Sequence, residues 1–318
     1  GLRFFLYHSL FEGFSEAFSF VFVPLYALGF GASRSQIGLL SAASNLMGTA
    51  ALYPGARLDD LLSPRHLRKW LVVFGFGGYR LALLLVATVP WFAAGQGAIA
   101  WVIVLMSLGY FLYNTGLPAW TALGGNLIPV ERRKRYFTTR NLTVAIAVFV
   151  GSPVAGLLIR WGGHPVGYQG ALALAFGFGI IAALSLALVP TLPVQPVKGE
   201  LQGEAKLPTR RLLTSYPAFA NVSLHTLLLF LSIWIAGPFF NVYLVESLGG
   251  TTATVGIMAA VENLVRIFSI RFFGRMAERW GTKRMMVLTA IPICLIPFGW
   301  LLVRAPWQAV LLSVLAGV

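Results

Sequence analysis

The clearest structural signal in this sequence is the segment Gly274-Arg275-Met276-Ala277-Glu278-Arg279-Trp280-Gly281-Thr282-Lys283-Arg284. It combines a glycine, an acid four residues later, an arginine, a second glycine and a basic pair. Long apolar stretches, 252–272 and 285–303, lie on either side of it. An earlier apolar stretch, 35–55, is followed by a weaker form of the segment. This form is Gly55-Ala56-Arg57-Leu58-Asp59, and its glycine is the last residue of the stretch. The same kind of segment therefore occurs twice, each time after an apolar stretch.

Apolar stretches of this length recur along the whole chain. A bilayer core about 30 Å thick needs about 20 apolar residues in a helix that rises 1.5 Å per residue. Nine stretches qualify: 4–28, 35–55, 70–92, 97–120, 139–160, 167–190, 216–245, 252–272 and 285–303. A tenth begins near Ala305. They are apolar on all sides and do not alternate as barrel strands would. The sequence therefore predicts an all-α polytopic membrane protein.

The composition excludes the common soluble classes. The 318 residues are 58% hydrophobic and only 11% charged, with a mean hydropathy of +0.79. A soluble protein of this composition would expose large apolar patches, so soluble enzymes and nucleic-acid-binding proteins are not expected. The chain has one cysteine, Cys294, and so no intrachain disulfide.

The breaks between the apolar stretches carry the charge unevenly. Eighteen of the 24 lysines and arginines lie in or beside the even-numbered breaks, against three in the odd-numbered breaks: Arg34, Arg160 and Arg304. Loops rich in Lys and Arg stay in the cytoplasm, so the even-numbered breaks are predicted to be cytoplasmic, in what we expect to be a bacterial inner membrane. The net charge of +14 is then mainly a matter of topology, and no nucleic-acid partner is expected.

An internal repeat divides the chain. Residues 37–46 (IGLLSAASNL) align with residues 255–264 (VGIMAAVENL) at an offset of 218 residues. The longest polar break, rich in Pro, Gly and charged residues, lies near the middle and is typical of a linker. We therefore expect an N-terminal half at 1–192, a cytoplasmic linker at 193–215 and a C-terminal half at 216–318.

The two charged segments give the chain a family resemblance. The segment at 274–284 resembles the signature loop of the major facilitator superfamily, whereas the first copy has Asp60 where arginine is usual. The resemblance implies a bundle of two pseudo-symmetric six-helix halves. Members usually have twelve spans, so helices eleven, twelve and most of ten are expected to lie outside this sequence.

The resemblance also implies a conformational latch at the cytoplasmic face. Acids there can pair with neighbouring helices in one state and separate as the halves rock. The alternative is that these charges only set the topology. The candidate residues are Gly55, Asp59, Arg68, Gly274, Glu278, Arg279, Gly281, Lys283 and Arg284.

A glycine- and proline-rich stretch, Gly151-Ser152-Pro153-Val154-Ala155-Gly156, partly resembles the fifth helix of antiporters in this family. Here Ser152 interrupts the usual glycine-proline pair. Close helix packing is the alternative reading, because both residue types are common in membrane helices.

Ionisable residues inside the apolar stretches are costly and often functional. His8, Glu12 and Glu16 follow one another at steps of four and so share a helix face. We expect Glu12, Glu16 and Glu262 to be candidates for proton coupling, and the alternative for the first two is polar contact between helices. Two cations are candidates for buried ion pairs, Arg80 with a carboxylate of the first helix and Arg266 with Glu262.

Aromatic side chains with a few polar groups are typical of a cavity for an organic solute, although Trp and Tyr also gather at membrane interfaces. The cavity candidates are His8, Tyr113, Asn114, His225 and Trp234. His225 is equally consistent with a packed core residue.

These observations predict a secondary active transporter, not an enzyme, that moves a small organic solute by alternating access in the lipid bilayer. Proton coupling is favoured, as efflux antiport or uptake symport, and a monomer is expected. Two alternatives stay open: a gradient-independent uniporter, and a non-transporting sensor or lipid-handling protein with the same fold. Neither a Gly-Lys-Ser/Thr phosphate loop nor a His-Glu-x-x-His pair occurs, so no cofactor and no metal site are expected.

Overall fold

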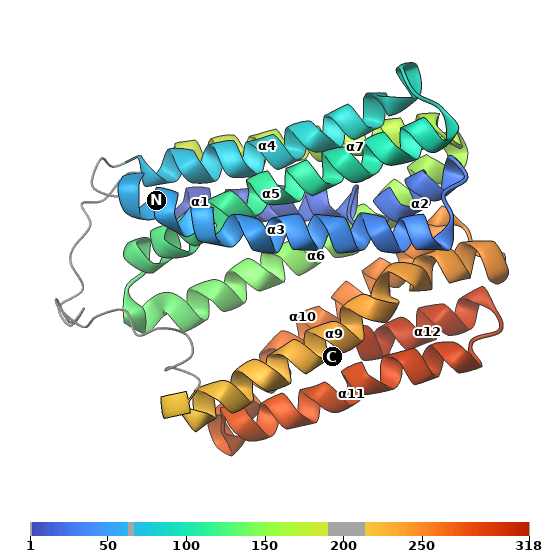
Figure 1. Cartoon of the computed structure of the whole chain (residues 1–318). Helices are drawn as coiled ribbons and strands as arrows, with labels where there is room; N and C mark the ends of the chain where they lie inside the picture. Colours follow the sequence, from blue (N-terminus) through green and yellow to red (C-terminus); the bar gives the residue numbers. More distant parts are fainter. Residues whose placement is uncertain (1, 63–66, 190–213, 318) are drawn as a thin grey trace.

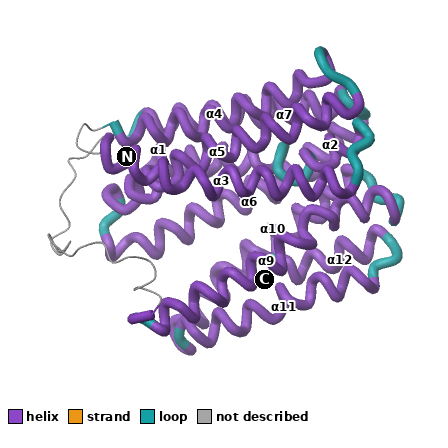
Figure 2. Tube along the Cα trace, in the orientation of Figure 1, coloured by secondary structure: helices purple, strands orange, loops and turns teal. Residues whose placement is uncertain are grey.

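The computed structural model describes residues 2–62, 67–189 and 214–317, and their regular structure is entirely helical (Figures 1 and 2). The prediction of an all-α fold is confirmed. Six of the helices are long and apolar enough to cross a membrane. The elements are α1 (Leu2–Ala17), α2 (Val23–Gly29), α3 (Arg34–Leu62), α4 (Arg68–Thr88), the 3-10 helix η2 (Val89–Trp91), α5 (Gly95–Leu127), α6 (Val130–Gly162), α7 (Val166–Ala187), α9 (Pro217–Ser247), α10 (Thr252–Trp280), α11 (Thr282–Leu302) and α12 (Pro306–Ala316).

The first predicted span, 4–28, is divided into two helices. A turn at residues 18–22 separates α1 from α2, and Pro24 lies in the first turn of α2. Proline has no backbone N–H to donate to the preceding turn, so it favours a helix start and disfavours a helix interior. The expectation of one continuous helix was therefore wrong at this point.

Several helices extend beyond the predicted apolar stretches into charged sequence. α3 continues to Leu62, and α6 begins at Val130, nine residues before the predicted span at 139–160. Hydropathy falls where charged residues begin, whereas Arg and Lys are good helix formers. Helices therefore continue past the apolar segment.

Two groups of helices can be distinguished in Figure 1, and they contact each other mainly through α6 and α10. In the N-terminal group, α1–α7, α5 lies along both α3 and α4, and α1 packs against α6 and α7. In the C-terminal group, α9–α12, α12 packs against α10 and α11. α3 and α10 are both 29 residues long, and their starts at Arg34 and Thr252 differ by the offset of the sequence repeat. Most of the predicted linker at 193–215 lies outside the described residues.

The two groups meet along α6 and α10. A Cβ atom added to Gly156 would lie 2.5 Å from the carbonyl oxygen of Thr252, and one at Gly256 would collide with the carbonyl oxygen of Ser152. The Thr252 hydroxyl also donates to the carbonyl oxygen of Gly156, at 3.0 Å. The glycine- and proline-rich stretch therefore allows two backbones to approach closely, as small residues do between membrane helices.

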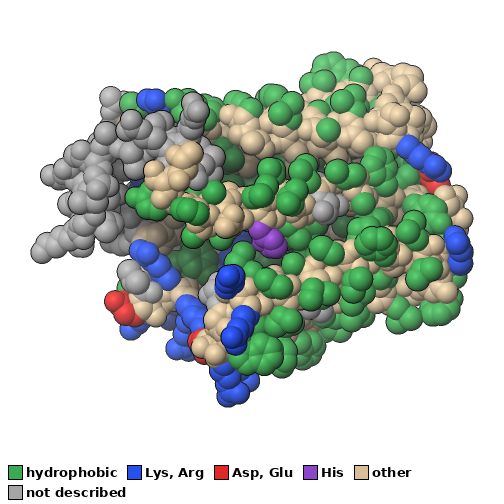
Figure 3. All heavy atoms as spheres, turned by 60° about the horizontal axis from the view of Figure 1, so that its bottom comes forward, with side chains coloured by type: hydrophobic (Ala, Val, Ile, Leu, Met, Phe, Trp, Pro, Cys, Tyr) green, Lys and Arg blue, Asp and Glu red, His purple; other side chains and the backbone are tan. Residues whose placement is uncertain are grey.

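The ends of the bundle differ in charge. The last residues of α3, α5 and α10 and the first residues of α4, α6 and α11 lie at the end of the bundle that Figure 1 shows on the left. This basic end carries most of the Lys and Arg side chains visible in Figure 3, while hydrophobic side chains cover the flanks. The other end, with the turns around Arg34, Arg160 and Arg304, is called the opposite end below.

Among the described residues, the hydrophobic cluster that includes both groups lies near the opposite end. This cluster includes Tyr26, Val89 and Ile99 from the N-terminal group and Val255 and Val303 from the C-terminal group. A second cluster, nearer the basic end, comes from the N-terminal group alone and includes residues such as Phe5, Val72 and Tyr136. The groups are thus joined by shared core at one end of the molecule.

Candidate functional site

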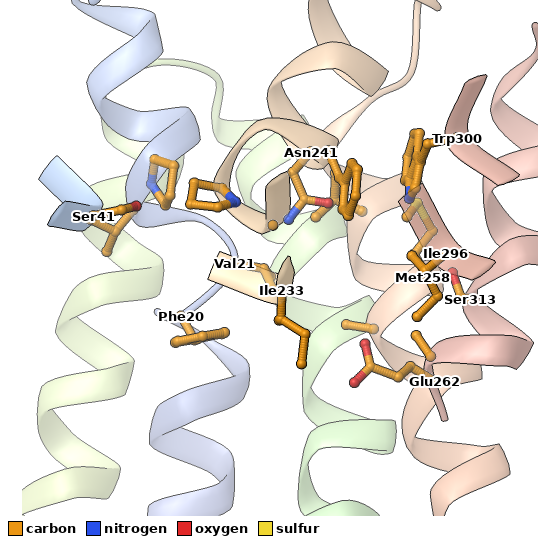
Figure 4. Close-up of a pocket in the computed structure, with 18 of the residues that line it drawn as sticks. Phe20, Val21, Ser41, Ile233, Asn241, Met258, Glu262, Ile296, Trp300 and Ser313 are labelled. Atoms are coloured by element: carbon orange, nitrogen blue, oxygen red, sulfur yellow. The ribbon is translucent and has the colours of Figure 1, made fainter. Parts of the chain in front are cut away.

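A cavity of 480 Å³ lies between the two groups of helices. Figure 4 shows residues from both groups turned toward it: Phe20 and Val21 from the turn before α2, Ser41 from α3, and Asn241, Met258, Glu262 and Trp300 from the C-terminal group. Trp300 stacks on Phe240, with ring centroids 4.9 Å apart. The lining is therefore mainly apolar and aromatic, with a few polar groups, as is usual for a site that takes an organic solute. We call this space the central cavity.

One ion pair lies on the wall of the central cavity. The guanidinium Nη2 of Arg266 is 2.5 Å from Oε1 of Glu262, and its Nη1 is 3.3 Å from Oδ1 of Asn263. Glu262 and Arg266 are four residues apart in the sequence, and the structure confirms that they form a pair on α10. Within this pair, the carboxylate and the cation neutralise each other.

A second, smaller pocket of 190 Å³ lies within the N-terminal group. We call it the inner pocket. Three of its residues, Phe20, Tyr79 and Tyr110, also line the central cavity, so the two spaces adjoin. The others are Glu12, Glu16, Ser19, Arg80 and Tyr113. It therefore contains most of the ionisable residues of the N-terminal group that the sequence places within apolar stretches.

Glu12 is held by three neighbours. Its Oε2 is 2.7 Å from Nε2 of His8, and its Oε1 accepts a hydrogen bond from the Tyr113 hydroxyl at 2.9 Å. Nη2 of Arg80 donates to the same Oε1 at 3.4 Å. The Glu12 side chain is only 7% exposed. A carboxylate with a guanidinium, an imidazole and a phenol around it is electrostatically compensated in spite of its burial.

His8 lies behind Glu12 and lines neither cavity, contrary to its expected place in the substrate cavity. The residue is 1% exposed, and its Nδ1 is 3.2 Å from the carbonyl oxygen of Ala182 on α7. The two ring nitrogens of His8 therefore lie close to oxygen atoms of two different helices, Oε2 of Glu12 on α1 and the carbonyl oxygen of Ala182 on α7. The position favours a structural contact between α1 and α7.

Glu16 differs from Glu12 although it lies one turn further along the same helix. Its side chain faces the inner pocket and is only partly buried. Among the described residues it forms neither an ion pair nor a side-chain hydrogen bond. Glu16 is therefore the carboxylate of this pocket that has the capacity to bind a ligand or a proton.

The other predicted cavity residues are placed as follows. Tyr113 reaches the inner pocket. Asn114 donates to the carbonyl oxygen of Tyr110 on its own helix, at 2.9 Å, and is not part of either lining. His225 is half-buried on α9 away from both cavities, and the side chain of Trp234 lies outside the described part of the structure.

The predicted latch residues lie at the basic end. Nε of Arg68 donates to Oδ1 of Asp59 at 2.5 Å, which joins the end of α3 to the start of α4. Glu278 of α10 pairs with Lys134 of α6, so this ion pair joins the two groups of helices. The sequence pattern gave no sign of Lys134 as a partner.

The glycines next to these acids differ between the two copies. Gly55 lies against α5, where an added Cβ would be 2.5 Å from the carbonyl oxygen of Thr115, whereas Gly274 has no such neighbour within 4 Å. Gly281 has a φ of +82°, a conformation that favours glycine, and it ends α10. The remaining residues of the segment, Arg279, Lys283 and Arg284, lie around this turn.

The opposite end also holds a contact between the groups. Nε of Arg34 on α3 donates to Oε2 of Glu246 on α9 at 3.4 Å. Nearby, a Cβ at Gly38 would lie 3.2 Å from the ring of Phe239. Together with the shared core, these contacts join the two groups at this end.

Several lining residues have no polar or positional signal in the sequence. Phe20, Tyr79, Phe240 and Trp300 belong to stretches that are apolar on every side, so periodicity does not show which face meets a cavity. The bend before α2, which Pro24 could have indicated, is what turns Phe20 inward. Among the described residues, no group of three His, Cys, Asp or Glu side chains could hold a metal ion.

We compared the sequence with known protein families and proteins. The sequence profile of the Major Facilitator Superfamily matches residues 8–318. A multi-drug resistance efflux pump, a PmrA homolog of Lactococcus lactis subsp. lactis, is 22% identical over 319 residues, which cover 96% of this chain and 73% of that protein.

Solved structures of transporters share the fold. A mutant of the nucleoside transporter NupG has a TM-score of 0.68 at 16% identity, and covers all of this chain and 79% of its own. A mutant of the peptide transporter POT in complex with sulfate has a TM-score of 0.54 at 15% identity, with the same coverage. At these identities the likeness concerns the fold alone.

Proposed function

Because the chain belongs to the Major Facilitator Superfamily, we propose that it is a proton-coupled secondary active transporter that moves a small organic solute by alternating access. Its membership makes it a multi-pass membrane transporter and not an enzyme. The direction of transport, the coupling ion and the solute class are the finer parts of the proposal. The observation that carries it is the central cavity between two groups of helices, with carboxylates on and beside its wall.

The two groups are proposed to be the halves of the transporter, 1–192 and 216–318, with the linker at 193–215 between them. The shared core and the Arg34–Glu246 pair hold the halves together at the opposite end, whereas the second core cluster involves the N-terminal half alone. This arrangement supports a state in which the central cavity opens toward the basic end. With the basic end in the cytoplasm, the state is inward-facing.

The proposed proton carrier is Glu16. Glu12 is already compensated by His8, Arg80 and Tyr113, and Glu262 is paired with Arg266. Glu16 has no such partner among the described residues and faces a pocket next to the solute path. A carboxylate in this position can take up a proton in one state of the transporter and release it in the other.

The experiment is transport by the full chain in proteoliposomes. Uptake of radiolabelled neutral, cationic and anionic organic solutes is measured with and without a pH gradient. Glu16→Gln imitates the protonated carboxyl, so it should abolish accumulation driven by the pH gradient while exchange of solute down its own gradient continues at saturating solute concentration. Glu131→Gln, the same change at an exposed position of the basic end, should behave as the wild type.

Each other result has a defined meaning. Accumulation that persists in Glu16→Gln places the proton carrier elsewhere, with Glu262 the next candidate. Wild-type flux that ignores the pH gradient would identify a uniporter. An absence of flux for every solute class would favour the non-transporting alternative.

A further inference from the structure

The inner pocket and the central cavity form one continuous path. Phe20, Tyr79 and Tyr110 line both spaces and so form the neck between them. Beyond this neck, the inner pocket has a volume of 190 Å³ and the central cavity is more than twice as large, at 480 Å³. A ligand that fills both therefore has a compact head and a larger body.

The neck and the inner pocket are built from aromatic rings. Tyr79 contacts Tyr110 and Tyr113 edge to face, with centroids 5.5 and 5.6 Å apart. Tyr79 is also the ring over which the Arg80 guanidinium lies, at 4.8 Å from the centroid. This pocket therefore already holds one organic cation against an aromatic face, the arrangement that stabilises cations in proteins.

The cation of the inner pocket, Arg80, already has a carboxylate partner, whereas the carboxylate of Glu16 has no cationic partner among the described residues. Arg80 is held by Glu12 and by Tyr79, and its stem fills the space beside Gly179, where an added Cβ would collide with it. Glu16 has no ion pair or side-chain hydrogen bond among the described residues. The phenols of Tyr79, Tyr110 and Tyr113 line the same pocket as Glu16. The charged groups that act on Glu16 are Glu12, Arg266, Arg80 and Arg140.

We propose that the inner pocket binds the ammonium head group of an organic cation, with Glu16 as its counter-ion and Phe20, Tyr79 and Tyr110 around it. The apolar body of the ligand lies in the central cavity, against Met258 and Trp300. The ammonium group belongs to the transported solute, so the assignment rests on the transport function proposed above. It adds to that function the class of solute and the place of its charge.

The same contacts argue against other ligand classes. An anion would need Arg80, which is engaged by Glu12, and it would approach two carboxylates. A metal ion needs several oxygen or nitrogen ligands, whereas the pocket offers one unpaired carboxylate beside aromatic rings. An ammonium group needs only one carboxylate when ring faces complete its surroundings.

The test is equilibrium binding to the purified full chain in detergent, measured by calorimetry. The probes are benzyltrimethylammonium and, as a matched anion, benzenesulfonate. We expect the wild type to bind the cation saturably and the anion not at all. Loss of the counter-ion in Glu16→Gln should weaken cation binding by roughly tenfold or more, as for other charged contacts.

Control variants separate the pocket from a general change of charge. Glu131→Gln removes an exposed carboxylate of the basic end instead and should leave binding nearly unchanged. Tyr110→Phe should retain binding and Tyr110→Leu should lose it. Glu16→Asp restores the charge and should recover part of the affinity, which excludes a folding defect as the cause of the loss.

The outcomes distinguish this proposal from the transport function. No saturable binding of the cation by the wild type, equal binding of the anion, or full affinity in Glu16→Gln would each overturn it. Cation binding that depends on Glu16, without flux of the same cation in proteoliposomes, would support the ammonium site and contradict the transport proposal. Flux of other solutes, without binding or flux of the cation, would support the transport proposal and contradict the ammonium site.

Discussion

Glu12 and Glu16 lie one helical turn apart on α1, and their surroundings give them different roles. His8, Arg80 and Tyr113 meet at Glu12, which joins α1 to α4, α5 and, through His8, to α7. Glu16 has an open pocket in front of it. Residues of the same type on the same face can therefore serve structure and function respectively, because burial and partners decide what each carboxylate does.

This difference predicts that the same substitution has different effects at the two positions. Glu12→Gln leaves the buried Arg80 without its counter-charge, which typically costs about 3–5 kcal/mol. We therefore expect Glu12→Gln to lower the melting temperature of the purified protein strongly. Glu16→Gln, four residues away, should melt near the wild type. Equal melting temperatures for Glu12→Gln and the wild type would show that Glu12 is not the central contact of this cluster.

At the scale of the helices, the contact between α6 and α10 depends on glycine. A methyl group at Gly156 would meet the backbone of Thr252, which cannot move aside as a flexible side chain can. Overpacking of this kind usually costs about 1–3 kcal/mol. Gly156→Ala should therefore lower the melting temperature by several degrees and reduce transport.

The matched control for this change is Gly177→Ala. Gly177 is also within a helix, α7, and has open space where a Cβ would be added. This variant should be neutral or slightly stabilising, since alanine is the better helix former. If the two alanine variants have the same melting temperature, the close approach of α6 and α10 has no energetic importance.

The ion pair between Lys134 and Glu278 links the same two helices at the basic end. Both side chains are 63% exposed, so the pair should contribute little to stability. As a latch it should matter for the balance between states. Lys134→Glu or Glu278→Lys should each reduce transport severalfold without a change in melting temperature, and the double exchange should restore it.

A charge reversal at the neighbouring Arg135 serves as the control. Arg135 is exposed in the same turn of α6 and is not paired with Glu278. Arg135→Glu should therefore have a smaller effect on transport rate than Lys134→Glu. Failure of the double exchange to restore transport would mean that the pair only contributes to topology.

Hydropathy and local residue spacing predict some features of this molecule and miss others. Hydropathy located the helices because each must offer about 20 apolar residues to the bilayer. It did not give the bend before α2 or the inward faces of Phe20 and Trp300, because these stretches are apolar all round. Helical spacing suggested Glu262 with Arg266, whereas Lys134 and Glu278 are 144 residues apart, beyond any local rule.

For the whole molecule, the uneven charge predicts an orientation. Single cysteines replace Asp60 at the basic end and Ser247 at the opposite end, both exposed, in a Cys294→Ser background. An impermeant thiol reagent added to intact cells should label Ser247→Cys, and should label Asp60→Cys only after the cells are permeabilised. Labelling of Asp60→Cys from outside would invert the proposed topology and make the state outward-facing.

The electrical behaviour of the transporter follows from the ion pair on the wall of the central cavity. Glu262 and Arg266 move together on α10 and have no net charge, so the membrane voltage does no work on them as the halves rock. If Glu16 exchanges one proton for one monovalent cation, each direction of the cycle moves the same charge. A voltage of 100 mV is worth about 2.3 kcal/mol for one charge, and in such a cycle this term cancels. Transport would then draw on the pH difference alone and continue unchanged in a depolarised membrane.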